Sequence, residues 1–210
     1  MFPPHPFGRW ARWLCGGFVW LSLSFRAGAS LPGLDAPEPV TKYFNSKFPS
    51  NAASLGSAPA TLSLTTLFDN LTTLSPHTGL MPYDVNSPAW ADGAQARRWL
   101  ALPNNGAPIT STQKITNAAT APWSFPVGTV IVKHFDLPID DTNPTLLKKV
   151  ETQILVLSSA SVWYALTYRW RDDQSDADLL TSASDTLRNF TIPTGPSTTR
   201  TQTWTYLPRA

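Results

Sequence analysis

The clearest hydrophobic pattern lies in the second half of the chain. Apolar and β-branched residues dominate GTVIVKHF (residues 128–135), which predicts a strand in the interior of a sheet. Residues 150–157 form a second expected strand, and after a short loop at 158–161 a partner follows at 162–171. In this partner one side chain in two is apolar, which indicates one buried face; the apolar set is Val162, Tyr164, Leu166, Tyr168 and Trp170.

Helical signals are short by comparison. They predict brief helices at 63–68, which begins with Ser63, at 94–99, and at 175–180, where Ser175 and Asp178 are spaced like a capping box. Prolines and glycines make most of 70–93 an irregular loop, and the Thr-rich tail favours strand. The expected fold is mainly β, an antiparallel sheet or β-sandwich with short helices and long loops.

The first 29 residues have the pattern of a secretory signal peptide. Arg9 and Arg12 precede an apolar stretch at 13–25, and the small residues Ala27, Gly28 and Ala29 follow. An apolar helix needs roughly 20 residues to cross a bilayer, so cleavage is favoured over an uncleaved anchor. We therefore expect a periplasmic or secreted protein, with a Pro/Ala/Ser-rich leader at 30–60 and a single β-rich domain at 61–210.

Removal of the signal changes the charge and the chemistry of the chain. The signal contains three arginines and no acidic residue, so 13 Lys and Arg remain against 14 Asp and Glu. No cationic field is left to attract nucleic acid or a membrane surface. Cys15 is the only cysteine and leaves too, which excludes disulfides, thiolate metal sites, a cysteine nucleophile and covalent haem.

Two histidines remain after export, His77 and His134. Neither forms a metal-ligand spacing with another ligand type, so no metal site is expected. His134 follows Lys133 on the expected interior strand, and one hypothesis makes the two part of a noncovalent cofactor pocket. The interpretation favoured for both histidines is structural.

The loop at 83–93 holds aromatic rings among carboxylates and amides: Tyr83, Asp84, Trp90 and Asp92. Carbohydrate clefts use this combination, because rings stack on sugar faces while short polar groups bind hydroxyls. The alternative is structural, with Tyr83 and Trp90 holding the loop on the core and the aspartates closing turns.

Other candidate chemistry is weaker. Four aspartates after the hairpin could suggest calcium, but the pattern lacks the glycine and distal glutamate of an EF-hand, and a helix start explains it better. They are Asp172, Asp173, Asp176 and Asp178. The sequence contains no nucleophile elbow, phosphate loop or dinucleotide fingerprint, so no catalytic residue is assigned.

Several stretches, in order, resemble a family of uncharacterised secreted bacterial proteins. They are GLMPYDVNSPAWADG (79–93), RRW (97–99), FPVGTVIVKHF (125–135), WYALTYRW (163–170) and DADLL (176–180), within a match over about 62–206. Gln153 departs from the arginine expected in the family's E-T-R pattern, so no charged site is transferred to that strand.

The resemblance implies a setting near electron transfer. In that family the module is typically followed by a c-type cytochrome region, and some members are fused to a quinone-dependent sugar dehydrogenase propeller. Trp204 and Tyr206 match the segment that leads into the C-x-x-C-H haem motif, and that motif is missing here. The chain is then either a stand-alone module or one truncated before its cytochrome, and truncation is favoured.

Together these observations predict a non-catalytic periplasmic accessory module. Its expected partner is a cytochrome c or sugar dehydrogenase domain, and haem c is expected only in full-length relatives. The alternative is a carbohydrate-binding or carbohydrate-active domain that uses Tyr83, Asp84, Trp90 and Asp92. An interface intended for a partner would also leave an apolar patch, which predicts self-association.

Overall fold

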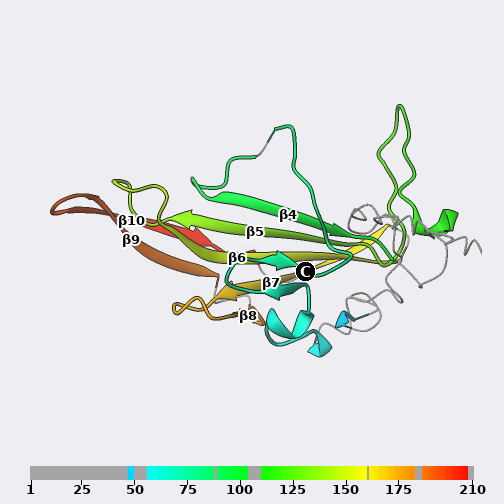
Figure 1. Cartoon of the computed structure of the whole chain (residues 1–210), viewed down its shortest axis with the longest axis horizontal. Helices are drawn as coiled ribbons and strands as arrows, with labels where there is room; N and C mark the ends of the chain where they lie inside the picture. Colours follow the sequence, from blue (N-terminus) through cyan, green and yellow to red (C-terminus); the bar gives the residue numbers. More distant parts are fainter. Residues whose placement is uncertain are drawn as a thin grey trace, which may run out of the picture.

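A computed structural model describes residues 47–49, 56–87, 89–103, 110–159, 161–182 and 186–207. Its centre is a six-stranded antiparallel sheet in the order β3-β4-β5-β6-β7-β8 (Figure 1). The strands are β3 (Met81–Pro82), β4 (Gln95–Ala101), β5 (Val130–Pro138), β6 (Leu147–Ser159), β7 (Val162–Trp170) and β8 (Ala177–Leu179). The mainly β, antiparallel prediction is confirmed. Within the described residues no helix is long and apolar enough to cross a membrane.

Two small hairpins accompany the sheet. One pairs β1 (Phe68–Asn70) with β2 (Ser75–Pro76), and the other pairs β9 (Leu187–Gly195) with β10 (Thr198–Thr205). The remaining described elements are single 3-10 turns, η2 (Ser63–Thr65) and η3 (Ser111–Gln113). The expected signal at 1–29 and most of the leader at 30–60 lie outside the described residues.

The predicted hairpin and interior strand are confirmed, whereas three predicted helices are not found. The helix at 63–68 is reduced to the turn η2, and 177–179 within the third is β8. Residues 95–101 are β4, although Ala96, Arg97 and Arg98 favour helix in isolation. Pairing of this segment with β5 and burial of Trp99 and Ala101 outweigh that local preference.

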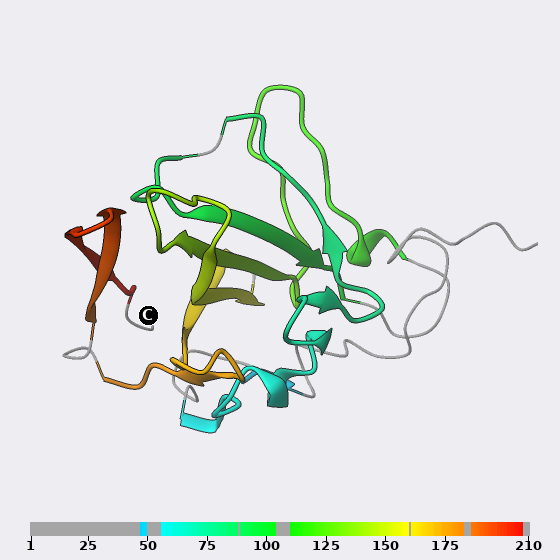
Figure 2. The same cartoon turned by 60° about the vertical axis from the view of Figure 1, so that its left-hand side comes forward.

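The sheet has two faces that are covered by different parts of the chain (Figure 2). On the first face, which we call the N-segment face, Val130, Val132 and Ile154 pack against residues from 58 to 80. On the other, the hairpin face, Phe135 and Leu137 pack against β9 and β10. The faces alternate along each strand because successive side chains point to opposite sides.

A β-bulge shifts the register where β5 pairs with β6. Phe135 pairs with Glu151 but Asp136 pairs with Lys149, so Val150 is the extra residue. Val150 packs in the core of the hairpin face. The extra residue places Lys149 on the N-segment face and Lys148 on the hairpin face. Without the bulge, the two lysines would lie on the reverse faces.

Candidate functional site

The residues singled out in the sequence do not gather at one point. Tyr83, Asp84, Trp90 and Asp92 lie on the long loop between β3 and β4, and all four are exposed. The hypothesis that Trp90 holds this loop on the core is wrong, because 84% of its surface is exposed. The contacts that attach the loop to the hairpin face come from alanines instead, Ala91 and Ala94. Asp92 and Gly93 both have positive φ, 51° and 82°, and turn the chain into β4.

Lys133 and His134 point to opposite faces and cannot form one pocket together. Lys133 lies on the hairpin face directly across from Arg98, with its ammonium 4.4 Å from the ring centroid of Phe135. Burial, followed by the nearby Arg98, lowers the pKa of Lys133. Arg98 is itself attached to the loop, since its guanidinium donates to Asp84 Oδ1 at 3.3 Å and its carbonyl accepts from Tyr83 N at 3.0 Å.

A hollow of about 410 Å³ opens beside this group, lined by Tyr83, Asp84 and Arg98 among others. Partial burial raises the pKa of Tyr83, so its hydroxyl stays protonated at neutral pH. The arrangement offers a ring, a carboxylate and a guanidinium to a solute. The ring and the carboxylate are two of the groups expected from the loop sequence, and the guanidinium of Arg98 is a third group that was not assigned there.

His134 belongs to a fully buried network on the N-segment face. The indole of Trp170 donates to Thr152 Oγ1 at 3.0 Å, and that oxygen lies 2.8 Å from His134 Nδ1. His134 Nε2 is 3.1 Å from Asp136 Oδ1, where it can donate. Burial lowers the pKa of His134, which keeps the ring neutral. The structural interpretation of His134 therefore agrees with its surroundings.

The carboxylate of Asp136 connects this network to the surface. Besides His134, it accepts from Arg97 Nε at 3.0 Å and pairs with Arg97 Nη2 at 2.9 Å. Burial alone would raise the pKa of Asp136, but the hydrogen bond from His134, together with the charge and hydrogen bond of Arg97, lowers it overall. A hollow of about 510 Å³ lies next to Asp136, Arg97 and Lys149.

Glu151 is the buried acid of the hairpin face. Its oxygens accept from the indole of Trp204 at 2.9 Å, from the amide of Gln153 at 3.0 Å and from the backbone of Leu207 at 3.4 Å. Burial nevertheless raises the pKa of Glu151. These bonds attach the end of β10 to the middle of the sheet, which gives Glu151 a structural position.

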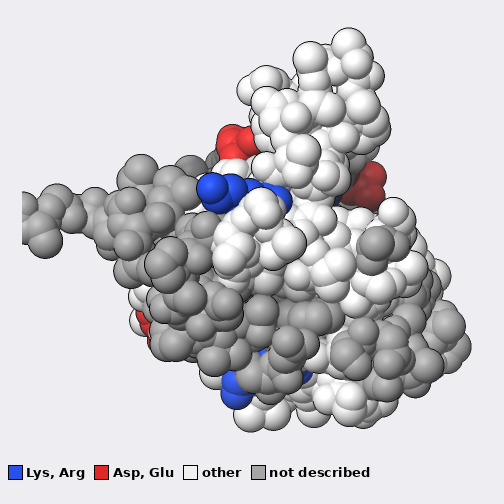
Figure 3. All heavy atoms as spheres, turned by 90° about the vertical axis from the view of Figure 1, so that its right-hand side faces the viewer, with Lys and Arg blue, Asp and Glu red and all other residues white. Residues whose placement is uncertain are grey.

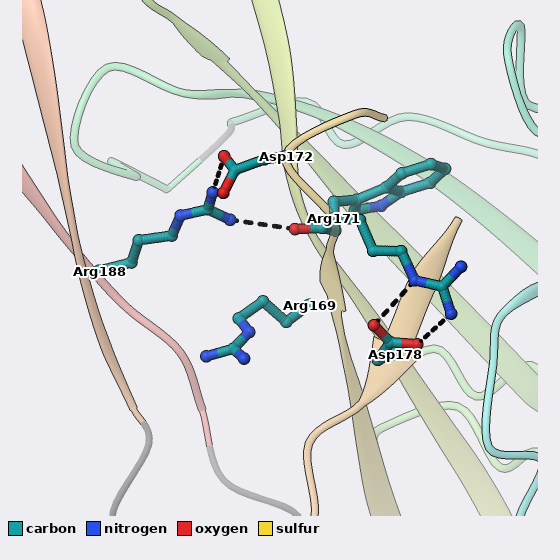
Figure 4. A pocket seen from close by; sticks show the side chains of 6 residues that line it. Arg169, Arg171, Asp172, Asp178 and Arg188 are labelled. Carbon is teal, nitrogen blue, oxygen red and sulfur yellow. Dashed lines mark hydrogen bonds and ion pairs between the residues drawn. The ribbon is translucent and has the colours of Figure 1, made fainter. Parts of the chain in front are cut away.

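A third hollow, of about 370 Å³, lies between β7 and β9 and is rich in arginine (Figure 4). Its guanidinium groups are largely engaged by carboxylates. Arg171 holds Asp178 through two hydrogen bonds of 2.9 and 2.6 Å, and Arg188 pairs with Asp172 and donates to the Trp170 carbonyl at 3.0 Å. Arg169 enters the same hollow from β7 (Figure 4). The contacts of Arg188 join the β9-β10 hairpin to the sheet, and the pair of Arg171 with Asp178 links the end of β7 to β8.

The four aspartates that follow β7 each bond to a different partner and form no common site. Asp173 accepts from Ser175, while Asp176 accepts from the backbone of Ser63 at 3.1 Å and from its hydroxyl at 2.6 Å. The helix-start interpretation was wrong, because this segment leads into β8 and Asp176 attaches the turn η2 to it. Across the described ranges, no three His, Cys, Asp or Glu side chains are grouped to hold a metal ion.

One end of the sheet is apolar on its surface. We call it the aromatic end and define it by the segment 123–127 and the start of β7 at Val162 and Trp163. Phe125 meets the ring of Trp163 edge-on, with centroids 6.1 Å apart. Trp123 is 57% exposed, Val162 48%, Val127 44% and Trp163 37%.

The surface around the aromatic end has few charges. Residues 111–128 form a projecting lobe, and only Lys114 in this stretch is charged. Figure 3 shows this end of the molecule, where the lobe is almost entirely uncharged. The apolar patch expected from the sequence could not be located in advance, because residues 111–128 lack strand or helix periodicity.

The sequence and the structure were compared with protein-family models, curated proteins and solved structures, and none of them matches. Its function must therefore be inferred from the chain's own residues and from the resemblance described above.

Proposed function

We propose that this chain is a non-catalytic periplasmic accessory module that packs against a c-type cytochrome or sugar dehydrogenase domain. The resemblance over residues 62–206 supports the choice of partner, because relatives carry such domains in the same chain. The observation on which the proposal chiefly depends is the aromatic end. Contiguous exposed apolar surface on a soluble domain marks a protein-protein contact.

The composition of the aromatic end supports a protein partner over a small ligand. Interface cores are depleted of charge and enriched in aromatic residues, and Trp123 and Trp163 with two exposed valines fit this description. Truncation of a central tryptophan in such an interface commonly costs 2 kcal/mol or more in binding, about a thirtyfold change in affinity. Trp123 and Trp163 are therefore the residues to test.

The experiment is a titration of the purified protein with the c-type cytochrome region of a family member, followed by calorimetry. We expect the double variant Trp123→Ser, Trp163→Ser to weaken binding by tenfold or more. Trp90→Ser is the matched control, because it removes an even more exposed indole from another surface, and it should bind as the wild type does. Equal affinity of all three proteins, or no binding by the wild type, would contradict the proposal.

A carbohydrate-binding role is the second candidate, and the exposure of Trp90 favours it. An indole on a loop that also presents Tyr83 and Asp84 is placed to stack on a sugar ring. The test is a glycan array with wild type and Trp90→Ala. Binding that disappears in the variant while its melting temperature is unchanged would support this role, and an array without any bound glycan would remove it.

A further inference from the structure

The hollow of about 510 Å³ on the N-segment face lies apart from the aromatic end, and it shares only Arg97 with the hollow beside Tyr83 and Asp84. It lies at the end of the sheet where β4 and β6 begin, next to the bulge in β6. Its floor is the carboxylate of Asp136, and its walls include Arg97, Lys149, Gln95 and Thr72. Its volume falls within the roughly 300–1,000 Å³ typical of small-molecule sites.

The hollow holds two cations and one carboxylate. Asp136 is already engaged by the His134 ring and twice by Arg97, which leaves little capacity for Lys149. The contact described for the Lys149 ammonium is with the ring of Trp170, 4.7 Å from the centroid. Among the described residues no oxygen accepts a hydrogen bond from this ammonium. The site thus has a net charge of +1 and donors to spare.

Both cations are held in place before any ligand arrives. Arg97 is fixed by Asp136 on one side and by the Thr73 carbonyl, which accepts from Nη1 at 3.1 Å, on the other. A guanidinium has five N–H groups, so two remain for a ligand. Lys149 is positioned over Trp170, whose indole is itself bonded to Thr152. Such preorganised donors bind oxyanions well because little order is lost on binding.

We propose that Arg97 and Lys149 bind the carboxylate of a small hydroxylated acid, such as a sugar acid. A single positive charge matches a monovalent carboxylate better than a dianionic phosphate. The amide of Gln95 and the hydroxyl of Thr72 line the rim and supply partners for ligand hydroxyls. This site does not depend on the aromatic end, so the two proposals can fail separately.

The test is calorimetric titration of the purified protein with D-glucuronate, D-glucose and inorganic phosphate at one ionic strength. D-Glucose is the matched neutral probe, since the two sugars differ at the carboxylate carbon. We expect D-glucuronate to bind and D-glucose not to bind. No detectable D-glucuronate binding at millimolar concentration, or tighter binding of phosphate, would overturn the proposal.

Variants locate the site. Lys149→Gln should weaken D-glucuronate binding at least tenfold, while Lys148→Gln, the same change on the opposite face, should leave it unchanged. If Lys149→Gln fails to fold, Gln95→Glu places a negative charge on the exposed rim and should abolish binding without disturbing the core. Equal weakening by both lysine variants, or full binding by Gln95→Glu, would refute the site.

Discussion

The two ends of the six-stranded sheet differ in the side chains at their surface: one end carries paired charges and the other carries exposed apolar groups. At the end where β4 begins, which we call the charged end, Arg97 pairs with Asp136, Arg188 with Asp172 and Arg200 with Asp141. At the aromatic end the surface holds two exposed tryptophans and two exposed valines. These arginines at the charged end are paired within the chain, and Lys149 is the cation there that no oxygen engages among the described residues, whereas at the aromatic end the exposed surface is apolar.

Under the proposed function, this difference separates residues that stabilise the fold from residues that contact a partner. Trp204 lies in the hairpin core near the charged end, buried and hydrogen-bonded to Glu151, so it contributes to folding. Trp163 has the same side chain but keeps 37% of its surface exposed. Only contact with a partner molecule would bury that remaining surface. Substitutions of these two tryptophans should therefore have opposite profiles, a prediction that can be tested by stability and by binding.

The largest expected effect is that of Trp204→Ala on stability. The change removes a buried indole that meets Phe135 edge-on at 5.3 Å, and it deprives Glu151 of a donor. We expect a loss of about 3–5 kcal/mol in the free energy of unfolding, measured by urea denaturation. Trp163→Ala should lose about 1 kcal/mol or less, since 37% of the surface of this side chain is already exposed. Equal losses would remove the distinction between the two ends.

The next effect is a dependence of stability on pH that originates in the His134 network. The folded state lowers the pKa of His134, so the neutral ring stabilises the protein above the unfolded pKa near 6.5. This contribution is lost as the pH falls below 6.5, by up to about 1.4 kcal/mol for each pH unit until the folded pKa is reached. Asp136, whose pKa is also lowered, adds to the loss only at more acidic pH.

The measurement is the free energy of unfolding at pH 7.5, 6.5 and 5.5. His134→Asn should be less stable than the wild type at pH 7.5 but should lose less on acidification. A wild-type slope that survives in His134→Asn would show that another group is responsible.

A smaller effect is expected on self-association. The exposed apolar surface of the aromatic end should bring copies of the chain together at high concentration. We expect Trp123→Ser with Trp163→Ser to weaken this association about tenfold in sedimentation velocity, which corresponds to about 1.4 kcal/mol. A wild type that sediments as a monomer at millimolar concentration would contradict the prediction.

The smallest expected effect comes from the exposed ion pair between Arg200 and Asp141. Arg200 Nε and Nη2 donate to the two carboxylate oxygens at 2.7 and 2.9 Å, and each partner is about 40% exposed. Exposed pairs of this kind contribute little because solvent screens them. Arg200→Gln should leave the melting temperature unchanged within error, and a clear drop would mean that this pair stabilises the hairpin.

The sequence predicted the parts of the fold whose pattern is local. Alternation in 162–170 and the β-branched run before His134 correctly predicted β7 and β5, because the sheet buries these side chains in strand periodicity. The predicted helices failed where distant contacts decide the structure. Asp176 bonds to Ser63, 113 residues away, and no local pattern indicates such a contact.

For the candidate sites, the sequence indicated which kinds of residue could bind a ligand but not which of them the fold brings together. Exposure of Tyr83 and Trp90 agrees with a binding loop, but the position of Arg98 between Asp84 and Lys133 depends on the pairing of β4 with β5. The hollow beside Lys149 depends on a bulge at Val150, which shifts Lys149 to one face and Lys148 to the other. A bulge in a run of alternating residues leaves no clear mark in one sequence.

The central claim, that the aromatic end is a docking surface, is tested most directly by radical footprinting of tryptophan oxidation. The purified protein would be measured alone and in the presence of the c-type cytochrome region of a family member. The account predicts that Trp123 and Trp163 become protected in the complex while Trp90 is oxidised as before. Protection of Trp90 in their place, or unchanged oxidation of all three, would contradict it.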